Sequence, residues 1–334
     1  MLEGIVISAQ GGSYAVQTEQ GDFQCALRHH VVEAEERRRS ETNEMPYVDL
    51  VAAGDRVQME PSDSDQGRGY IEEILERRTR FGRTRMDGWR QVIVANLDLL
   101  LIVFAARQPQ LKLRMIDRFL VTAEASGLIP VIIINKMDLV AFDDLKSQMA
   151  LYEDLGYKVI YTSTLADTGI DDVRQIMGDQ ISAFVGSSGV GKSSLLNAIQ
   201  PGLSLRVGEV DERWHKGQHT TTTVTLLPLA FGGYVADTPG VRTLGLLDIA
   251  EEQAMDVFFP DLRPYLPSCQ YRSCRHSQEP GCAVQAAVKS GQIDSGRYDS
   301  YLRLSGLKEG RFERNIDKKS SKTKNRERRR GYAR

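Results

Sequence analysis

Residues Gly186–Ser193, with the sequence GSSGVGKS, fit the phosphate-binding pattern G-x-x-x-x-G-K-[ST]. An apolar segment of strand length, Ile181–Val185, precedes the pattern, and Ser194–Ile199 begins a helix behind it. In this context backbone N–H groups and the positive end of the helix dipole face the phosphates. We therefore predict an α/β nucleotide-binding domain in which Lys192 reaches the β- and γ-phosphates and Ser193 binds magnesium. The residues expected to line the phosphate site are Gly186, Ser187, Ser188, Gly189, Val190, Gly191, Lys192, Ser193 and Ser194.

A second motif indicates which base is bound. Asn135-Lys136-Met137-Asp138 follows the apolar run Val131–Ile134 and matches N-K-x-D, the signature of guanine recognition. A carboxylate at Asp138 can accept hydrogen bonds from guanine N1–H and from the 2-amino group, whereas adenine lacks this pair of donors and would leave a buried charge unpaired. Ser163-Thr164 stands where such GTPases carry a Ser-Ala pair. The expected base-binding residues are Asn135, Lys136, Asp138, Ser163 and Thr164.

A third motif concerns the γ-phosphate. Asp237-Thr238-Pro239-Gly240 matches D-x-x-G, in which the aspartate supports magnesium and the Gly240 amide senses the γ-phosphate. The long polar stretch before it, 201–223, has the length and polarity of a mobile switch loop. We expect Thr221 to complete the magnesium shell when GTP is bound, with Thr222 as the alternative. Each short motif is weak alone, but together they select GTP.

The order of these motifs is unusual. Ras-like GTPases carry the P-loop first and N-K-x-D later, whereas here Asn135–Asp138 precedes Gly186–Ser193. The termini of a compact α/β domain lie close together, so joining them and cutting elsewhere preserves the site. The chain is therefore expected to contain a circularly permuted GTPase domain.

Length and composition suit a multidomain globular protein. The chain has 334 residues, of which 26% are charged. No apolar run reaches the roughly 20 residues needed to span a bilayer, and the N-terminus does not resemble a signal peptide. We expect a cytoplasmic monomer that does not bind membranes. The predicted divisions are a barrel over 1–80, the GTPase domain over 81–255, a zinc-binding domain over 256–307 and a disordered basic tail over 308–334.

The first eighty residues have a β pattern. Short apolar segments alternate with turn residues such as Gly11-Gly12, Gly21-Asp22 and Gly54-Asp55. Five such segments predict an OB-type barrel. Barrels of this kind often bind single-stranded nucleic acid, but the pattern equally fits a barrel that only packs against its neighbour. The charged segment Arg28–Pro46 is expected to form a long mobile loop between strands.

Arginines are concentrated between residues 77 and 90, together with Trp89. Two interpretations stay open at this point. The segment is either a solvated linker or a basic, aromatic strip that faces RNA phosphates. The basic end of the chain, with twelve Lys/Arg against four Asp/Glu from Lys308 to Arg334, is a second candidate for RNA contact.

Four potential metal ligands lie within a short stretch near the C-terminal end. Cys269, Cys274, His276 and Cys282 have the spacing C-x4-C-x-H-x5-C. Three thiolates and one imidazole form a common structural zinc set, and disulfides are rare in cytosolic proteins. We predict one zinc ion per chain. Cys25 lies far from this group in the sequence and is expected in the barrel core.

Taken together, these features resemble the RsgA/YjeQ family of bacterial GTPases that depend on the small ribosomal subunit. The likeness covers nearly the whole chain, and it is most specific at Ala95–Asp98, at the GTPase motifs and at the Cys/His cluster. It implies GTP hydrolysis that is stimulated by the small subunit during its late maturation, with binding to rRNA. The charged Arg28–Pro46 insertion and Gln218, where the family often has Arg, depart from the pattern.

The catalytic group is not supplied by the usual position. Ras-like GTPases place a glutamine directly after D-x-x-G to orient the attacking water, but this chain has Val241 there. The family resemblance suggests that His219 in the switch loop takes this role; Gln218 is the alternative, and His219 is then only a solvated loop residue. Two rival classes remain open, an ATP-using P-loop enzyme and an RNA-binding scaffold whose nucleotide site is structural.

Overall fold

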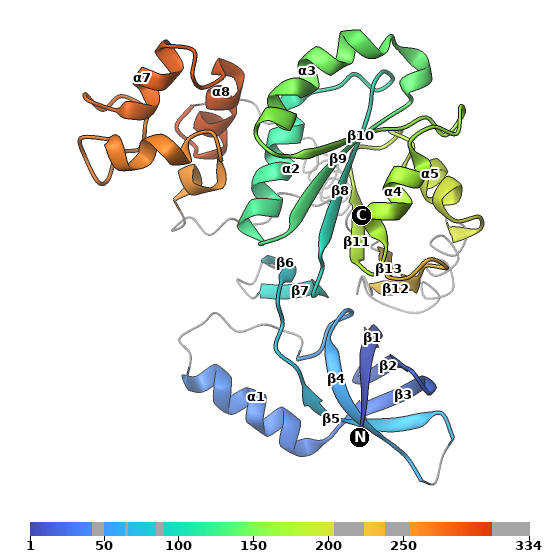
Figure 1. Ribbon diagram of the computed structural model, residues 1–334. Helices are drawn as coiled ribbons and strands as arrows, with labels where there is room; N and C mark the ends of the chain where they lie inside the picture. Colours follow the sequence, from blue (N-terminus) through green and yellow to red (C-terminus); the bar gives the residue numbers. More distant parts are fainter. Residues whose placement is uncertain (42–49, 64–65, 85–89, 204–223, 238–253, 309–334) are drawn as a thin grey trace, which may run out of the picture. The chain divides into compact units, whose positions relative to one another are not determined.

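The computed structural model describes residues 1–41, 50–63, 66–84, 90–203, 224–237 and 254–308. It divides into two compact units, Met1–Ala254 and Met255–Arg334 (Figure 1). No helix in these described ranges is long and apolar enough to cross a membrane. The predicted basic tail lies outside the described residues apart from Lys308, so the expectation of disorder stays a prediction.

The first unit begins with a closed five-stranded barrel. Its strands are β1 (Leu2–Gln10), β2 (Ser13–Thr18), β3 (Gly21–Leu27), β4 (Arg56–Pro61) and β5 (Arg68–Ile74). They follow the order β1-β2-β3-β5-β4, and β4 pairs back to β1. Alternate side chains fill the interior, which includes Val6, Val16, Cys25, Val57, Met59 and Ile71. The predicted OB-type barrel is confirmed, and Cys25 is a buried core residue as expected.

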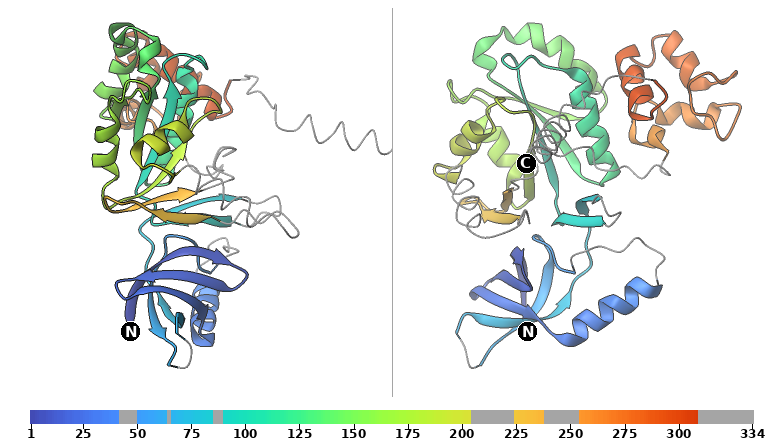
Figure 2. Two further views of the ribbon diagram at one scale, coloured as in Figure 1. Left: turned by 90° about the vertical axis from the view of Figure 1, so that its right-hand side faces the viewer. Right: turned by 180° about the vertical axis from the view of Figure 1, so that it is seen from behind.

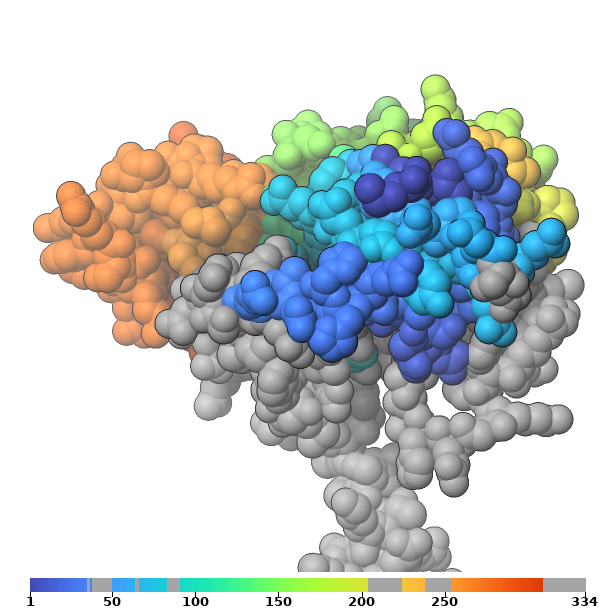
Figure 3. All heavy atoms as spheres, turned by 90° about the horizontal axis from the view of Figure 1, so that it is seen from below, coloured from blue at the N-terminus to red at the C-terminus, as the bar shows by residue number. Residues whose placement is uncertain are grey.

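The prediction of a loop over the charged insertion is wrong. Helix α1 (His29–Glu41) occupies most of this segment, and residues 42–46 lie outside the described chain. The helical stretch contains no Gly or Pro and is rich in Glu and Arg, which are good helix formers. Val31 is buried, and α1 contacts β5 on the outside of the barrel (Figure 3). A helix this polar has no apolar stripe, so its periodicity gave no sign of it.

The arginine-rich segment is likewise not a simple linker. Strands β6 (Arg80–Thr84) and β7 (Arg90–Ala95) pair as an antiparallel hairpin, whose residues 85–89 are not described. The Arg77 side chain is 10% exposed and forms a bidentate pair with Asp55, with Nε–Oδ1 at 2.6 Å and Nη2–Oδ2 at 2.7 Å. Arg78 pairs with Asp98 at 3.1 Å. Arg77 is therefore committed to the fold.

The GTPase part is a sheet between two helical layers (Figure 2). Strands β8 (Leu99–Ala105), β9 (Ile129–Asn135), β10 (Lys158–Tyr161), β11 (Ile181–Val185) and β13 (Tyr234–Asp237) are parallel, and β12 (Thr225–Pro228) is antiparallel to β13. The order is β10-β9-β8-β11-β13-β12. Helices α2 (Leu113–Ala125) and α3 (Phe142–Asp154) share one core, and α4 (Ile170–Met177) and α5 (Lys192–Ile199) share the other. The predicted α/β nucleotide-binding domain is confirmed.

Strand β1 belongs to both parts of the first unit. Val6 points into the barrel core, whereas Ile5 and Ile7 pack against the core that contains Leu226 and Ala236. The backbone of β1 also pairs with β12 in antiparallel register, Ser8 opposite Thr225. The barrel strands and the GTPase strands thereby form one 11-stranded sheet.

A second joint lies at Ala95–Asp98, the stretch that the family resemblance singles out. The Asn96 side chain donates to the Gly54 carbonyl at 2.9 Å and accepts from the Arg78 N–H at 2.8 Å. Gly54 has φ +91°, and a Cβ there would lie 2.0 Å from the Ala95 carbonyl oxygen. Only glycine fits this close approach of the barrel to β7. Asp98 accepts from the Ile181 N–H at 2.9 Å, which fixes the start of the P-loop strand.

The second unit is small and helical. It contains the 3₁₀ helices η3 (Met255–Phe258) and η4 (Arg263–Ser268) and the α-helices α7 (Ala283–Lys289) and α8 (Ser295–Leu304). Asp294 caps α8 by accepting from the Arg297 N–H. Arg297 is itself 1% exposed and pairs with Asp261 at 2.8 Å. Helix α7 begins directly after Cys282, the last of the predicted metal ligands.

The shared strand predicts a common unfolding transition. Ile7→Ala should destabilise the first unit by about 1–3 kcal/mol, because Ile7 packs against the GTPase core from a half-buried position. Val6→Ala is the matched variant on the barrel side. Thermal unfolding should show the same single transition in both variants, and GDP should raise its midpoint in both. A separate barrel transition that GDP does not move would contradict the shared strand.

Candidate nucleotide site and metal centre

The P-loop joins β11 to α5 in a conformation that requires glycine. Gly186 has φ +142°, and a Cβ there would lie 2.2 Å from the Val103 carbonyl oxygen. Gly191 has φ +96°, and its Cβ would lie 2.3 Å from Asn135 Nδ2. Lys192 Nζ donates to the carbonyls of Gly186 and Ser187 at 2.6 and 2.9 Å. The loop therefore curls around the lysine ammonium, as a phosphate cradle does.

The N-K-x-D motif holds the P-loop directly. Asn135 is fully buried, and its Nδ2 donates to the Val190 carbonyl at 3.0 Å. Lys136 has φ 63°, and its Nζ donates to the carbonyls of Gly189 and Gln108 at 2.6 Å each. The structure thus brings together two motifs that are separated in the sequence, at the carboxyl ends of β9 and β11, which lie on either side of β8 in the sheet.

Asp138 and Ser163 meet beside these contacts. Asp138 lies in the 3₁₀ helix η1 (Met137–Leu139), and the Ser163 hydroxyl donates to its Oδ1 at 2.5 Å. Ser163 also accepts from the Ala166 N–H at 3.1 Å, which fixes the loop around it. Thr164 is half-buried in the same loop. The carboxylate is therefore held in one orientation before any ligand is considered.

Sequence reasoning missed two supports of this site. Thr162 is fully buried, and its hydroxyl donates to Asn135 Oδ1 at 3.1 Å. The Gln108 carbonyl, in the loop after β8, accepts a hydrogen bond from Lys136 Nζ. Thr162 directly precedes Ser163, but nothing in its type distinguishes it from other threonines, and a backbone carbonyl leaves no trace in a sequence.

Only part of the predicted γ-phosphate site is described. Asp237 ends β13, which is parallel to the P-loop strand β11, and the residue is 5% exposed. Its carboxylate and the Ser193 hydroxyl are hard oxygen donors of the kind that magnesium prefers. The remaining predicted or alternative residues lie outside the described chain: Gln218, His219, Thr221, Thr222, Gly240 and Val241.

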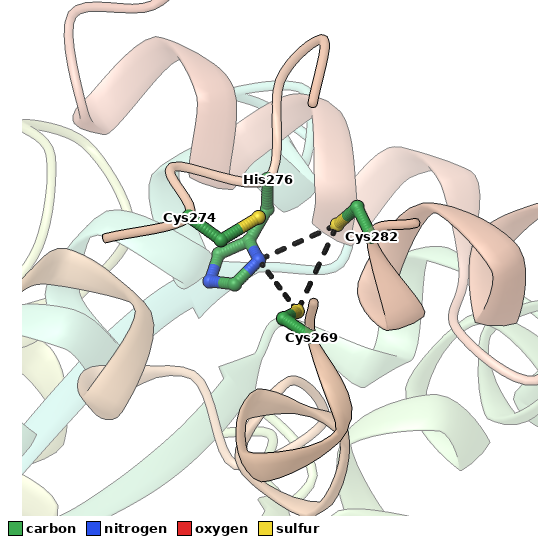
Figure 4. Close-up of side chains that lie close together, drawn as sticks. All are labelled: Cys269, Cys274, His276 and Cys282. Carbon is green, nitrogen blue, oxygen red and sulfur yellow. Dashed lines mark hydrogen bonds between the residues drawn. The ribbon is translucent and has the colours of Figure 1, made fainter. Parts of the chain in front are cut away.

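The four predicted metal ligands converge in the second unit (Figure 4). The donor atoms of Cys269, Cys274, His276 and Cys282 all lie within 4.8 Å of one another. His276 Nδ1 is 3.5 Å from the sulfurs of Cys269 and Cys282, and these sulfurs are 4.0 Å apart. A tetrahedral zinc site has N–S and S–S edges of about 3.6 and 3.8 Å, from its bond lengths. The cluster therefore has the size and donor set for one such ion.

Burial makes the Cys274 thiol dependent on a cation. Burial, with the nearby Cys282 and Cys269 thiols, raises the pKa of the Cys274 thiol to about 12. The group would therefore stay protonated at neutral pH without a positive charge nearby. A bound metal supplies that charge and releases the protons.

The loop that carries the ligands is organised by Glu279. Its carboxylate accepts from the N–H groups of Arg275, Ser277 and Gln278 at 2.9, 2.8 and 3.0 Å. Burial alone would raise the pKa of Glu279, but these backbone donors outweigh it and lower the pKa to about 2. The Tyr298 hydroxyl donates to the His276 carbonyl at 2.6 Å. The loop is thus fixed by contacts that do not involve the metal.

The permuted parallel sheet, the P-loop and the N-K-x-D contacts define a circularly permuted P-loop GTPase. A sequence model described as RsgA GTPase matches residues 74–247. The "Small ribosomal subunit biogenesis GTPase RsgA" of Gemmatimonas aurantiaca is 41% identical over 305 residues, 90% of this chain and 95% of that protein. The protein of the same name from Halalkalibacterium halodurans is 40% identical over the same shares of the two chains. The chain belongs to the RsgA GTPase family and is a GTP hydrolase.

Two solved structures are similar over nearly the whole length. YjeQ from Thermotoga maritima superposes with a TM-score of 0.69 at 33% identity, covering 92% of this chain and 98% of that one. YloQ, described as a circularly permuted GTPase, superposes with a TM-score of 0.67 at 31% identity, covering 93% and 97%. The predicted fold class is confirmed.

Thr162→Val should weaken the nucleotide site, because Thr162 supports the side chain of Asn135. The substitution keeps the shape of the side chain but leaves the buried Asn135 Oδ1 without the hydroxyl donor, which costs about 1–3 kcal/mol. We expect a lower free energy of unfolding in urea and a higher Kd for GDP. Thr162→Ser, which keeps the hydroxyl, is the control and should retain the wild-type Kd. Equal Kd values in all three proteins would show that Asn135 needs no such support.

Proposed function

We propose that this GTP hydrolase acts as a late-stage maturation factor of the small ribosomal subunit, binds its rRNA and is stimulated by it. The observation that supports this most is the direct contact of Asn135 and Lys136 with the P-loop carbonyls. It occurs in a chain whose relatives, aligned over 90% of its length, are named "Small ribosomal subunit biogenesis GTPase RsgA". GTP, GDP and the small subunit with its rRNA are then its partners. We place it in the cytoplasm as a monomer.

The nucleotide contacts follow from the positions of the side chains. Asp138, oriented by Ser163, accepts from the guanine base, and Lys136 lines the base pocket. The loop amides, Lys192 and the first turn of α5 take the phosphates. Ser193 and Thr221 bind magnesium, Asp237 supports the ion from the end of β13, and the Gly240 amide contacts the γ-phosphate.

Catalysis then depends on orienting water. Val241 has no hydrogen-bonding side chain, so the intrinsic rate is low. His219 takes the role of the usual glutamine when rRNA orders the switch loop around the nucleotide. Gln218 is the alternative at the neighbouring position. The established GTPase family removes the case for an ATP-using enzyme, and turnover separates a hydrolase from a scaffold.

Zinc is the metal that best fits the second unit. Three thiolates and one imidazole at tetrahedral spacing favour zinc over magnesium or calcium, which prefer oxygen. All four coordination positions are taken by side chains, which is typical of a structural site. We assign one zinc ion per chain to Cys269, Cys274, His276 and Cys282.

Base specificity tests the role of Asp138. Asp138→Asn replaces one acceptor oxygen by a donor, so it should weaken GTP and GDP binding and shift preference toward xanthine nucleotides. Displacement of a fluorescent guanine nucleotide measures this. ATP should fail to displace the probe from the wild type, and equal competition by ATP would reject the guanine assignment.

Elemental analysis tests the zinc assignment. Wild-type protein should contain about one zinc per chain. Cys274→Ser and His276→Ala should lower the zinc content and destabilise the second unit, while GDP binding survives because the first unit has its own core. A fully folded wild type without metal would contradict the assignment.

Turnover with ribosomal subunits tests the central proposal. Small subunits should stimulate GTP hydrolysis strongly, and large subunits or bulk RNA weakly. His219→Ala should keep GTP affinity but lose roughly 10²–10⁴-fold of the stimulated rate, whereas Lys192→Ala should lose nucleotide binding itself. Equal stimulation by any RNA would overturn the proposal, and normal turnover of His219→Ala would move the role to Gln218 or an RNA group.

A further inference from the structure

His276 makes a second contact besides those with the cysteines. Its Nε2 lies 2.9 Å from Asp256 Oδ2, on the side of the ring opposite Nδ1. His276 is 2% exposed, and the side chain of Asp256 is 15% exposed. The two nitrogens of one buried ring therefore face different partners, two sulfurs on one side and a carboxylate on the other.

This arrangement selects one tautomer of the imidazole. A neutral imidazole has one N–H, and a carboxylate at Nε2 accepts it. The lone pair of Nδ1 then points at the thiols, which is the form that a metal needs. Carboxylates in this position orient metal-binding histidines in many proteins and strengthen their ligation.

Within the described part of the chain, the Asp256 side chain makes no other hydrogen bond. Its Oδ1 is buried without a hydrogen-bond partner among the described residues. The backbone around it is held in place, because the Asp256 carbonyl accepts from the Phe259 N–H at 3.1 Å, and Phe259 is fully buried against Tyr301. A rigid backbone thus presents one carboxylate oxygen to one ring nitrogen.

Asp256 also lies at a particular place in the chain. It is the second residue of the second unit, which begins at Met255, and the chain reaches it from the D-x-x-G motif. The four cysteine and histidine ligands all come later in the sequence. Through this contact segment 255–259, at the start of the second unit, reaches a predicted metal ligand.

We propose that Asp256 is a positioning residue of the metal centre, which fixes Nδ1 of His276 as the ligand atom and fastens segment 255–259 to the ion. The proposal rests on the metal site proposed above. Metal retention and order of the segment are then linked, and by reciprocity the loss of either weakens the other.

The test measures zinc affinity in the full-length protein. Zinc transfer to a chromophoric chelator should show a Kd about 10–100-fold higher for Asp256→Ala than for the wild type. Asp256→Asn, whose amide oxygen still accepts, should fall between the two. Asp299→Asn is the matched control, since Asp299 is similarly buried but pairs with Arg303 and Lys308. GDP binding should be unchanged in all variants.

Two further measurements separate positioning from general stability. Long-range ¹H–¹⁵N spectra of zinc-loaded wild type should show His276 protonated at Nε2 and metal-bound at Nδ1. Hydrogen exchange should accelerate over 255–259 in Asp256→Ala and on zinc removal. Equal zinc affinity of wild type and Asp256→Ala, equal loss in Asp299→Asn, or ligation through Nε2 would overturn this proposal alone. A wild type that binds no zinc would overturn the metal assignment as well.

Discussion

The nucleotide site depends on the hydrogen bonds from Asn135 and Lys136 to the P-loop. These side chains donate to the carbonyls of Val190 and Gly189, and Gly191 has no room for a Cβ beside Asn135. The contacts join two strand ends in space and are indifferent to which motif comes first in the chain. A permuted order can therefore keep the site, provided that β9, β8 and β11 stay adjacent in the sheet, as they do here.

The same sheet carries the barrel. Val6 of β1 packs in the barrel core, and Ile5 and Ile7 of the same strand pack against the GTPase core. Tilting of the barrel would therefore disturb the packing against β12 and β13. Tyr234, three residues before Asp237, also donates from its hydroxyl to Gln17 of the barrel at 2.8 Å. A partner that binds the barrel would therefore also affect β12 and β13, the strands next to the predicted switch segments.

Local patterns in the sequence were sufficient for most of the fold and much of the site. Continuous apolar runs predicted the parallel strands, and the P-loop, N-K-x-D and Cys/His spacing predicted residues that do converge. The features that the sequence did not predict depend on long-range contacts or on polar side chains. Helix α1 has no apolar stripe, the Arg77–Asp55 pair joins residues from separate elements, and Thr162 acts through Asn135. The double use of β1 was also invisible, because alternation in a strand does not say how many cores its two faces serve.

The permutation has a physical consequence at the other end of the chain. In this order β8, β9, β10 and β11 all come before D-x-x-G in the chain. The chain beyond Asp237 continues to Met255, where the second unit begins. Asp256 is the second residue of that unit, and its carboxylate is hydrogen-bonded to His276, one of the predicted metal ligands. In the metal site proposed above, Asp256 thereby anchors segment 255–259 to the ion through His276.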